Sequence, residues 1–374
     1  MIYLAIFILA LTLIRLGVVL SNVLGQQWLR NGTPASEPLV SVLIPARNEE
    51  HNIGNILTDL VRHDYRNIEV WVYDDLSEDR TGEIARTFAE NDSRFHLLEG
   101  GELPVGWMGK NHGCHRLSLH ATGEYLLYLD ADVSIGRGLI RSAVAHAQKH
   151  RLDLFSVFPT QKMETWGEWI TVPIMNWILL SLLPLVLTRI SPRPSFSAAN
   201  GQFMMFRAEV YHRLQYHRML RNVKVEDIAI FWQMKREGLR THTVLGNRQI
   251  QCRMYQSYSD AVTGFTRSVF AFFGGSKTAA FLFGLVTTFG FIPVVVVLPQ
   301  VYTIFYFAMV VMIRAMISLA SRQSLVFNLL LAPLQQLSFL HVLVKAAFMQ
   351  KRRITRWKGR NVDKIADEDF NEKM

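Results

Sequence analysis

Two long runs without acidic or basic residues lie toward the ends of this chain and limit what it can fold into. Residues 1–24 contain one charge, Arg15, and residues 278–313 contain none. About 20 apolar residues in an α-helix cross the ~30 Å hydrocarbon core of a bilayer. A basic n-region and a small-residue cleavage site are not evident at the start of the chain. We therefore expect residues 1–24 to form an uncleaved N-terminal transmembrane anchor.

The run 278–313 is too long for one span, because 36 residues of helix would extend about 54 Å. Pro293 and Pro299 offer a break, which predicts two spans near 278–297 and 300–319.

A further run, 323–344, is interrupted by Pro333, Gln335 and Gln336. If the central region lies in the cytosol, a third span there would place the basic residues that follow it outside the cell. That placement is against the positive-inside rule. We expect this run to be re-entrant or interfacial. The whole region 278–349 is then a C-terminal membrane region of two to three spans, followed by a basic and mixed cytosolic tail, 350–374.

One more apolar run lies inside the central region. Residues 170–188 include no charged residue, but they contain two prolines and an asparagine. A span there would separate polar clusters that should share one site, so an amphipathic or interfacial element is favoured over a span. We expect it to border the site that these polar clusters form.

Composition removes several classes of protein. Of the 374 residues 11% are aromatic and 19% charged, which excludes a disordered chain. Two cysteines, Cys114 and Cys252, cannot form a disulfide framework and are typical of a reducing compartment. The net charge of +9 is concentrated beside the apolar runs, which favours lipid headgroups over nucleic acid. The sequence predicts no nucleic-acid partner and leaves the oligomeric state open.

The central region, 37–277, alternates short β-rich runs with helical patterns. Such alternation predicts an α/β domain with a mainly parallel sheet. Ligands bind such sheets at the carboxyl ends of the strands. The expected strands are 40–45, 68–73 and 125–129, and the expected helices lie near 49–62 and 81–91.

Acidic residues follow two of these strands. Asp130 and Asp132 end the run 125–129, and residues i and i+2 of an extended chain share a face. Two carboxylates so placed could hold a hard cation against a diphosphate, although the same tripeptide also occurs in solvated loops. Asp74 and Asp75 follow the run 68–73 and could accept hydrogen bonds from a base or sugar, or form a turn.

Two other clusters could carry chemistry. Lys110, after two glycines, could meet a phosphate or lie on the surface. Glu226 and Asp227 precede an expected helix, where acids favour the first turn. A carboxylate there could equally serve as a general base.

Taken in order, these clusters resemble the family 2 inverting glycosyltransferases. The motifs that carry the resemblance are residues 41–49 (SVLIPARNE), 73–81 (YDDLSEDRT), 129–132 (LDAD) and 225–227 (VED). Within that family the chain is similar to the membrane-bound branch that includes carotenoid and hopene-associated glycosyltransferases. That similarity rests on residues 103–110 (LPVGWMGK), 198–203 (AANGQF), 252–255 (CRMY) and 357–360 (WKGR).

The resemblance implies a GT-A fold, Rossmann-like, over residues 37–277, with a nucleotide-sugar donor, most often a UDP-sugar, and Mg²⁺ or Mn²⁺. It assigns the metal to Asp130 and Asp132, the diphosphate to Asp130, and the catalytic base to Asp227. The other residues that it implies in donor or acceptor binding are Pro45, Arg47, Glu49, Asp74, Asp75, Lys110, Asn200, Gly201, Gln202, Glu226 and Arg253.

The leading hypothesis is an integral membrane enzyme of the cell membrane, multi-pass, with its catalytic domain in the cytosol and a lipid, isoprenoid or carotenoid acceptor. A processive polysaccharide synthase of the same family is one alternative. Ile250 stands where its arginine motif has glutamine, and Tyr255 comes one residue late, which counts against it. A non-catalytic membrane scaffold that keeps the fold is another.

Overall fold

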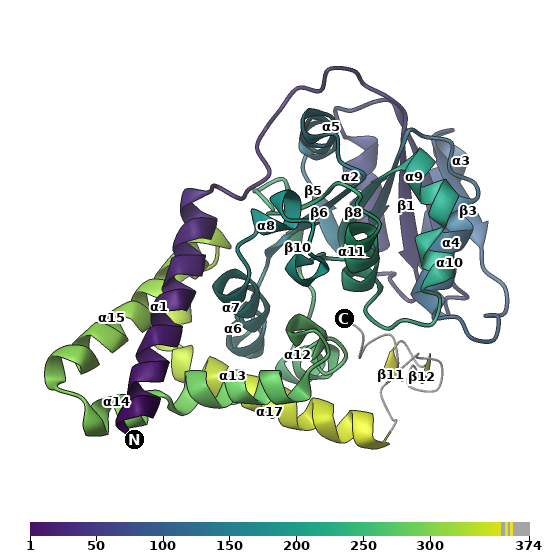
Figure 1. Cartoon of the computed structure of the whole chain (residues 1–374). Coiled ribbons are helices and arrows are strands. Elements are labelled where there is room, and N and C mark those ends of the chain that lie inside the picture. Colours follow the sequence, from purple (N-terminus) through teal and green to yellow (C-terminus); the bar gives the residue numbers. More distant parts are fainter. Residues whose placement is uncertain (353–355, 358–359, 362–374) are drawn as a thin grey trace.

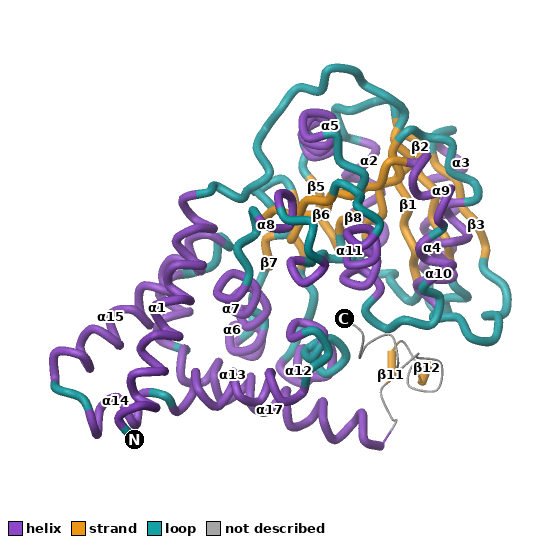
Figure 2. Tube along the Cα trace, viewed as in Figure 1, coloured by secondary structure: helices purple, strands orange, loops and turns teal. Residues whose placement is uncertain are grey.

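A seven-stranded sheet forms the centre of the molecule (Figures 1 and 2). The computed structural model describes residues 1–352, 356–357 and 360–361. β8 runs antiparallel to both neighbours, and the other pairs are parallel. This confirms the mainly parallel α/β sheet predicted from sequence. In spatial order the strands are β3 (Phe95–Glu99), β2 (Ile68–Asp74), β1 (Val40–Ala46), β4 (Tyr125–Leu129), β8 (Phe203–Arg207), β6 (Leu154–Phe158) and β9 (Thr241–Leu245).

Helices cover both faces of this sheet. Every residue of β4 is buried, as expected for a strand with helices on both sides. On one face the core is shared with α2 (Ile53–Val61), α3 (Thr81–Asn91) and α5 (Leu139–His150). On the other it is shared with α4 (Gly109–Ser118), α9 (Ala208–Leu214), α10 (Tyr216–Met219) and α11 (Glu226–Arg236). The strands and the two helices expected before residue 130 are thus confirmed.

The strand order places the loops that carry the acidic residues at one edge. β1 and β4 are neighbours, with β2 beyond β1, so the chain changes direction across the sheet between β1 and β4. Ligands bind parallel sheets at such a switch point. A small second sheet continues from this edge and consists of β5 (Val133–Ile135), β10 (Ile250–Cys252) and β7 (Thr160–Gln161).

The apolar run 170–188 differs from its expected interfacial position. It is divided among α6 (Trp166–Thr171), α7 (Pro173–Leu182) and α8 (Leu187–Ile190), followed by the short 3₁₀ turn η1 (Pro194–Phe196). Most side chains of α7 are buried, in one core with residues of α1 and of the C-terminal helices. A helix that is apolar all round is buried inside the protein, and α7 joins the sheet domain to the candidate membrane helices.

In the described part of the chain, two helices are long and apolar enough to cross a membrane, α1 (Ile2–Leu24) and α15 (Gln300–Ala320). A third candidate is the pair α13 (Lys277–Phe289) and α14 (Phe291–Val297), bent by 46°. These elements lie where the sequence predicted the anchor and two spans. The remaining helices are α12 (Tyr258–Phe265), the 3₁₀ turn η2 (Ala271–Phe273), α16 (Leu325–Leu330) and α17 (Ala332–Arg352).

α17 covers the run that the sequence predicted to be re-entrant or interfacial. It is not among the candidate spans in the described part of the chain. It packs along α13 and beneath α6 and α12 (Figure 1). Most of the predicted tail, 350–374, lies outside the described residues. Its described part consists of the end of α17 and the antiparallel pair β11 (Arg356–Trp357) and β12 (Arg360–Asn361).

α1 and α15 lie side by side and run in the same direction (Figure 1). Near their first turns Ala5 and Ile8 share a cluster with Tyr306. Just beyond their last turns, the indole of Trp28 donates a hydrogen bond of 2.7 Å to the carbonyl of Ala320. The sheet domain therefore lies at the C-terminal ends of both helices.

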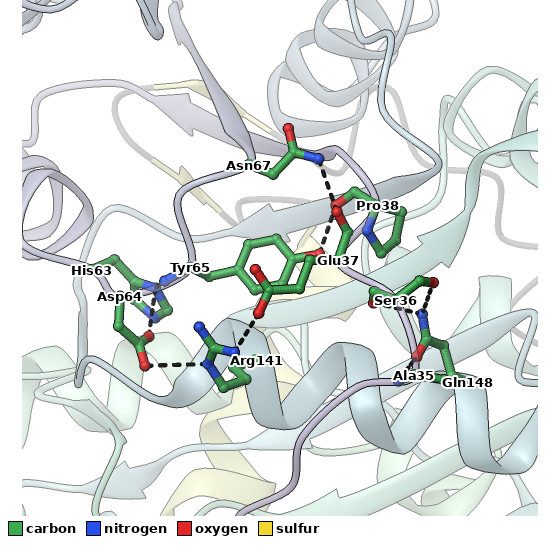
Figure 3. Close-up of polar contacts among 10 residues, drawn as sticks. All are labelled: Ala35, Ser36, Glu37, Pro38, His63, Asp64, Tyr65, Asn67, Arg141 and Gln148. Atoms are coloured by element: carbon green, nitrogen blue, oxygen red, sulfur yellow. Dashed lines mark hydrogen bonds and ion pairs between the residues drawn. The ribbon is translucent and has the colours of Figure 1, made fainter.

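The linker from α1 to β1 is held against the sheet domain. Leu29 donates a backbone hydrogen bond to Leu245 at the end of β9. Farther along, Gln148 on α5 bonds to Ala35 and Ser36 (Figure 3). The hydroxyl of Tyr65 donates to the carbonyl of Pro38 at 2.6 Å. These contacts fix the domain relative to the anchor.

The side chain of Asn22 forms three hydrogen bonds that join α1 to the end of α7 and the segment after it. Its side-chain amide donates to the carbonyls of Leu180 and Leu183 at 3.0 and 2.9 Å, and its oxygen accepts from the backbone of Leu185 at 2.7 Å. Asn22 is 2% exposed, so solvent cannot replace these bonds.

We expect Asn22→Ala to lower the free energy of unfolding by about 2–3 kcal/mol, because it leaves buried backbone groups without partners. Thermal unfolding of the full chain in detergent measures this as a lower midpoint. Asn55→Ala, on the exposed face of α2, is the control and should change stability by less than about 0.5 kcal/mol. Equal midpoints for the two variants would contradict the role of Asn22.

Candidate active site

A cleft of about 1050 Å³ opens at the carboxyl edge of the sheet. Its walls come from the loops after β1, β2 and β4, from the start of α4 and α11, and from α12. All of the sequence-predicted site residues except Asp74 line it: Pro45, Arg47, Glu49, Asp75, Lys110, Asp130, Asp132, Asn200, Gly201, Gln202, Glu226, Asp227 and Arg253.

Asp74 and Asp75 have different roles, as the two readings of that pair allowed. Asp74 accepts a hydrogen bond from the backbone of Ser77 at 3.2 Å and faces Gly82, so it holds the turn after β2. Asp75 is 5% exposed and faces the cleft. The predicted substrate contact therefore falls to Asp75, and the inclusion of Asp74 in the binding site is not supported by its position.

Arg47 shapes the wall beside Asp75. Its guanidinium donates to the carbonyl oxygens of Asp75 and Leu76, at 2.5 and 3.0 Å. These bonds tie the loop after β1 to the loop after β2. Glu49 follows on the same loop, and its backbone donates to the hydroxyl of Thr81 at 2.7 Å.

Lys110 is the cation at the centre of the cleft. Gly106, with φ of +80°, turns the chain toward α4, whose first turn carries Lys110. The ammonium lies 2.8 Å from Asp130 and 3.3 Å from Glu226. Burial alone would lower the pKa of Lys110, but these two carboxylates outweigh it and hold the pKa well above its usual range. Lys110 is therefore charged, and it joins β4 to α11.

The buried carboxyl group of Asp132 is not fully hydrogen-bonded. Its Oδ1 atom is buried and has no hydrogen-bond partner among the described residues. Burial, and then the nearby carboxylates of Asp130 and Glu49, raise the pKa of Asp132 to about 7. The thiol of Cys252 hydrogen-bonds to Asp132 and accepts from the amide of Gln202 at 2.7 Å.

Asp227 lies across the cleft, in the first turn of α11. Its Oδ2 accepts from the backbone N–H of Gly201 at 2.9 Å, and its Oδ1 accepts from that of Ile228 at 2.8 Å. A Cβ atom at Gly201 would lie 2.8 Å from the Lys110 ammonium, so the glycine leaves room for Lys110 beside this segment. Burial, and then Glu226, raise the pKa of Asp227 to about 7. A carboxylate with this pKa suits general base chemistry near neutral pH.

Neighbouring residues position the Gly201 amide. Asn200 donates its backbone N–H to the hydroxyl of Ser156 at 2.9 Å, and its side chain accepts from the backbone of Gln202 at 2.9 Å. The side chains of Asn200 and Gln202 are nearly fully buried. The segment 200–202 is therefore a rigid part of the cleft wall.

Arg253 lines the cleft but is already paired. Its guanidinium lies 2.8 Å from Glu168 and 2.6 Å from Glu164. Burial would raise the pKa of Glu168, but the hydrogen bond from Arg253 and two backbone hydrogen bonds lower it overall. Arg253 thus links β10 to the start of α6, and its charge is shared with two carboxylates.

The run 170–188 was expected to border the cleft, but it contributes no lining residue. The sequence also did not identify the wall that α12 and its flanking residues form. The only sequence signal for the α12 wall is its place between β10 and the first C-terminal apolar run. The added lining residues there are Tyr255, Gln256, Ser257, Asp260, Thr263, Gly264, Arg267 and Ser268.

Residues 41–215 match the profile of Glycosyl transferase family 2. The chain is 25% identical over 235 residues to a 4,4'-diaponeurosporenoate glycosyltransferase of Staphylococcus haemolyticus, covering 61% of this chain and 60% of that protein. It is 24% identical over 243 residues to the protein of the same name in Staphylococcus aureus, covering 64% of this chain and 62% of the relative. The chain thus spans about three fifths of the length of these curated relatives.

The fold is also similar to that of a mannosyltransferase from Pyrobaculum calidifontis, solved in complex with GDP-Man and Mn²⁺. The TM-score is 0.55 at 21% identity, over 92% of this chain and 98% of that one. The sheet domain therefore has the GT-A fold that the sequence resemblance implied.

Asp130 and Asp132 fit a divalent cation of the kind that GT-A enzymes use. The described residues contain no cluster of three or more His, Cys, Asp or Glu side chains that could hold a metal by themselves. Mg²⁺ typically binds through one or two carboxylates together with substrate phosphates and water. The buried Asp132 oxygen without a partner is the observation that supports a cation here.

We expect Asp132→Ala to weaken Mn²⁺ binding at least tenfold at pH 8, where the Asp132 carboxyl is ionised. Electron paramagnetic resonance of free Mn²⁺, with a nucleoside diphosphate present, measures the binding. Asp260→Ala is the matched control, because Asp260 lines the same cleft but accepts a hydrogen bond from the backbone of Gln256. Unchanged Mn²⁺ affinity in Asp132→Ala would remove Asp132 as a ligand.

Proposed function

We propose that this chain, in which residues 41–215 form a Glycosyl transferase family 2 domain, is a membrane-bound inverting glycosyltransferase. It transfers a sugar from a nucleotide-sugar, a UDP-sugar in the first instance, to a lipid or isoprenoid acceptor such as a carotenoid. The observation that carries the proposal is the meeting, in one cleft, of the Asp130 and Asp132 pair with a base of raised pKa, Asp227.

The donor would occupy the side of the cleft nearest the sheet. Pro45, Arg47, Glu49 and Asp75 form a wall there that suits a nucleoside, and the carboxylate of Asp75 can accept hydrogen bonds from a base. The mannosyltransferase of similar fold binds GDP-Man, so the nucleotide is part of the test below.

The diphosphate would meet Asp130, Asp132 and Lys110. A divalent cation bound at the two aspartates supplies compensation for the negative charge that grows on the departing diphosphate. Lys110 adds a fixed positive charge at the same point, since its ammonium already contacts Asp130. Glu226 orients Lys110 from the opposite side.

Asp227 would take the proton of the acceptor hydroxyl as its oxygen attacks the anomeric carbon. The proton goes to one of the Asp227 carboxylate oxygens, and the bond from the sugar to the diphosphate breaks in the same displacement. The Gly201 and Ile228 amides hold the carboxylate in one orientation for this transfer. A single displacement inverts the anomeric configuration and requires no covalent intermediate.

The acceptor would enter along α12. This helix forms one wall of the cleft and packs against α17, and Lys345 of α17 donates to the hydroxyl of Thr263 at 3.1 Å. An apolar acceptor can therefore approach from the candidate membrane helices with its polar end toward Asp227. The relatives named for diaponeurosporenoate support an isoprenoid acceptor. We place the chain in the cell membrane, multi-pass, with the cleft in the cytosol.

The function is tested with the full chain in detergent, UDP- and GDP-sugars, extracted bacterial lipids and Mn²⁺. We expect glycolipid formation and nucleotide release in equal amounts. Asp227→Asn should reduce the rate at least 10³-fold while leaving nucleotide binding unchanged, because it removes the base and keeps the shape of the side chain. Glu90→Gln, on the exposed surface of α3 and away from the cleft, is the control and should leave the rate unchanged. No transfer from any donor would reject the function, and an unchanged rate in Asp227→Asn would reject the base.

The pKa of Asp227 predicts a pH dependence. The base acts when ionised, so kcat/KM should rise about tenfold per pH unit below pH ~7 and become constant above it. The raised pKa also means that ionisation destabilises the folded chain as pH increases from about 4 to 7. The unfolding midpoint of Asp227→Asn, relative to wild type, should therefore increase between pH 5 and pH 8. A midpoint difference independent of pH would show that the Asp227 pKa is not raised.

A further inference from the structure

Two arginines are buried among the helices that reach away from the sheet domain. Arg15 belongs to α1 and Arg314 to α15, the two helices long and apolar enough to cross a membrane. Their exposed fractions are 6% and 7%. Charged residues inside membrane helices are rare and are usually part of a functional site.

Both guanidinium groups lie against one aromatic ring. The central carbon of Arg15 is 4.9 Å from the ring centroid of Trp177 on α7, and that of Arg314 is 5.4 Å from the same centroid. Arg15 also lies 5.1 Å from the Phe283 ring of α13. The ring therefore brings two positive charges from separate helices to one place.

The polar partners of these arginines are all neutral. Arg15 donates to the hydroxyl of Ser181 at 3.3 Å, and Arg314 donates to the side-chain oxygen of Gln335 at 2.8 Å and to the carbonyl of Ala332 at 3.5 Å. Among the described residues no carboxylate forms an ion pair with either arginine. The Nε atom of Arg15 is buried and has no hydrogen-bond partner in that part of the chain.

This cluster lacks a negative charge. Two like charges at one place in apolar surroundings repel each other, and aromatic rings attract them without neutralising them. A guanidinium group is shaped to donate two parallel hydrogen bonds to a phosphate or carboxylate. The unpartnered Arg15 Nε is such a donor.

The depth of the cluster indicates the source of an anion. Arg314 lies six residues, about 9 Å, before the end of α15 at the sheet domain, and Arg15 lies nine residues, about 14 Å, before the end of α1. If α1 and α15 span the bilayer, both side chains lie in the domain-facing half of its hydrocarbon core, which is about 15 Å deep. An arginine at that depth draws phosphate and water inward through local thinning of the bilayer. Phospholipid phosphates are the anions nearest to that level.

We propose that Arg15 and Arg314 form a binding site for one phosphate group, supplied by an anionic lipid of the domain-facing leaflet. The lipid would join α1, α7 and α15 at the point where the sheet domain meets the membrane. The site is separate from the cleft and contributes no group to the transfer reaction. It depends on the membrane position of the helices and not on the proposed activity.

The test uses the delipidated full chain in a neutral detergent. Thermal unfolding is followed while phosphatidylglycerol, diacylglycerol or inorganic phosphate is added. A ligand that binds only the folded state raises the midpoint as its concentration increases. We expect phosphatidylglycerol to raise the midpoint and diacylglycerol, which lacks the phosphate, to leave it unchanged. An equal rise with inorganic phosphate would support the site and assign it to free phosphate.

Arg15→Gln and Arg314→Gln should require at least tenfold more phosphatidylglycerol for the same rise. Arg322→Gln is the matched control, because Arg322 is exposed just beyond the end of α15 and would respond equally to non-specific attraction. If the glutamine variants do not fold, the double variant Arg15→Lys with Arg314→Lys keeps the charges and loses the paired donors. We expect at least fivefold weaker binding. Unchanged lipid dependence in the folded variants, or an equal response to diacylglycerol, would overturn the proposal.

Discussion

The contact of Lys110 with Asp130 and Glu226 holds together the chemistry of the cleft. These three side chains come from α4, the end of β4 and the start of α11, which are separated in sequence by up to 116 residues. Without the ammonium, the carboxylates at the carboxyl edge of the sheet would repel one another in a partly dehydrated space. Burial raises the pKa values of Asp132 and Asp227, and the neighbouring carboxylates, which one lysine does not balance, raise them further. A cleft of this kind favours cations and would accept a diphosphate only together with one.

The hydrogen-bond partners of Asp132 and Asp227 differ, which fits the different functions proposed for them. Asp132 lies beside Asp130 and has an oxygen without a partner, which suits a cation. Asp227 has both oxygens hydrogen-bonded to backbone amides and lies next to Glu226. Backbone amides orient the Asp227 carboxylate and leave it able to accept a proton, as the proposed base must. Two carboxylates with similar pKa values thus acquire different roles from their neighbours alone.

The sequence predicted the parts of the fold that depend on local pattern. β1, β2 and β4 are short apolar runs, and acids directly follow β2 and β4. The parallel arrangement brings the loops after all three strands to one edge whatever the details of packing. Asp74 and Asp75 could not be separated from sequence, since only the backbone direction after β2 decides which carboxylate faces the cleft. The position of α7 was not predicted either, because an apolar run looks the same whether lipid or protein covers it. Here α1, α13, α15 and α17 supply that cover, and all four lie more than 90 residues away in sequence.

The firm attachment of the sheet domain to the apolar helices limits which acceptor the proposed enzyme can use. Asn22, Trp28 and the linker clamps fix the domain against α1 and α15, and α7 is buried between them. A domain held this firmly cannot search the solvent for an acceptor, so the acceptor has to come to the cleft. The α12 wall lies on the side from which a molecule in the bilayer would come, because α12 rests on α17. Rigid attachment therefore favours an acceptor confined to the membrane over a soluble one, since confinement raises its local concentration at a fixed cleft.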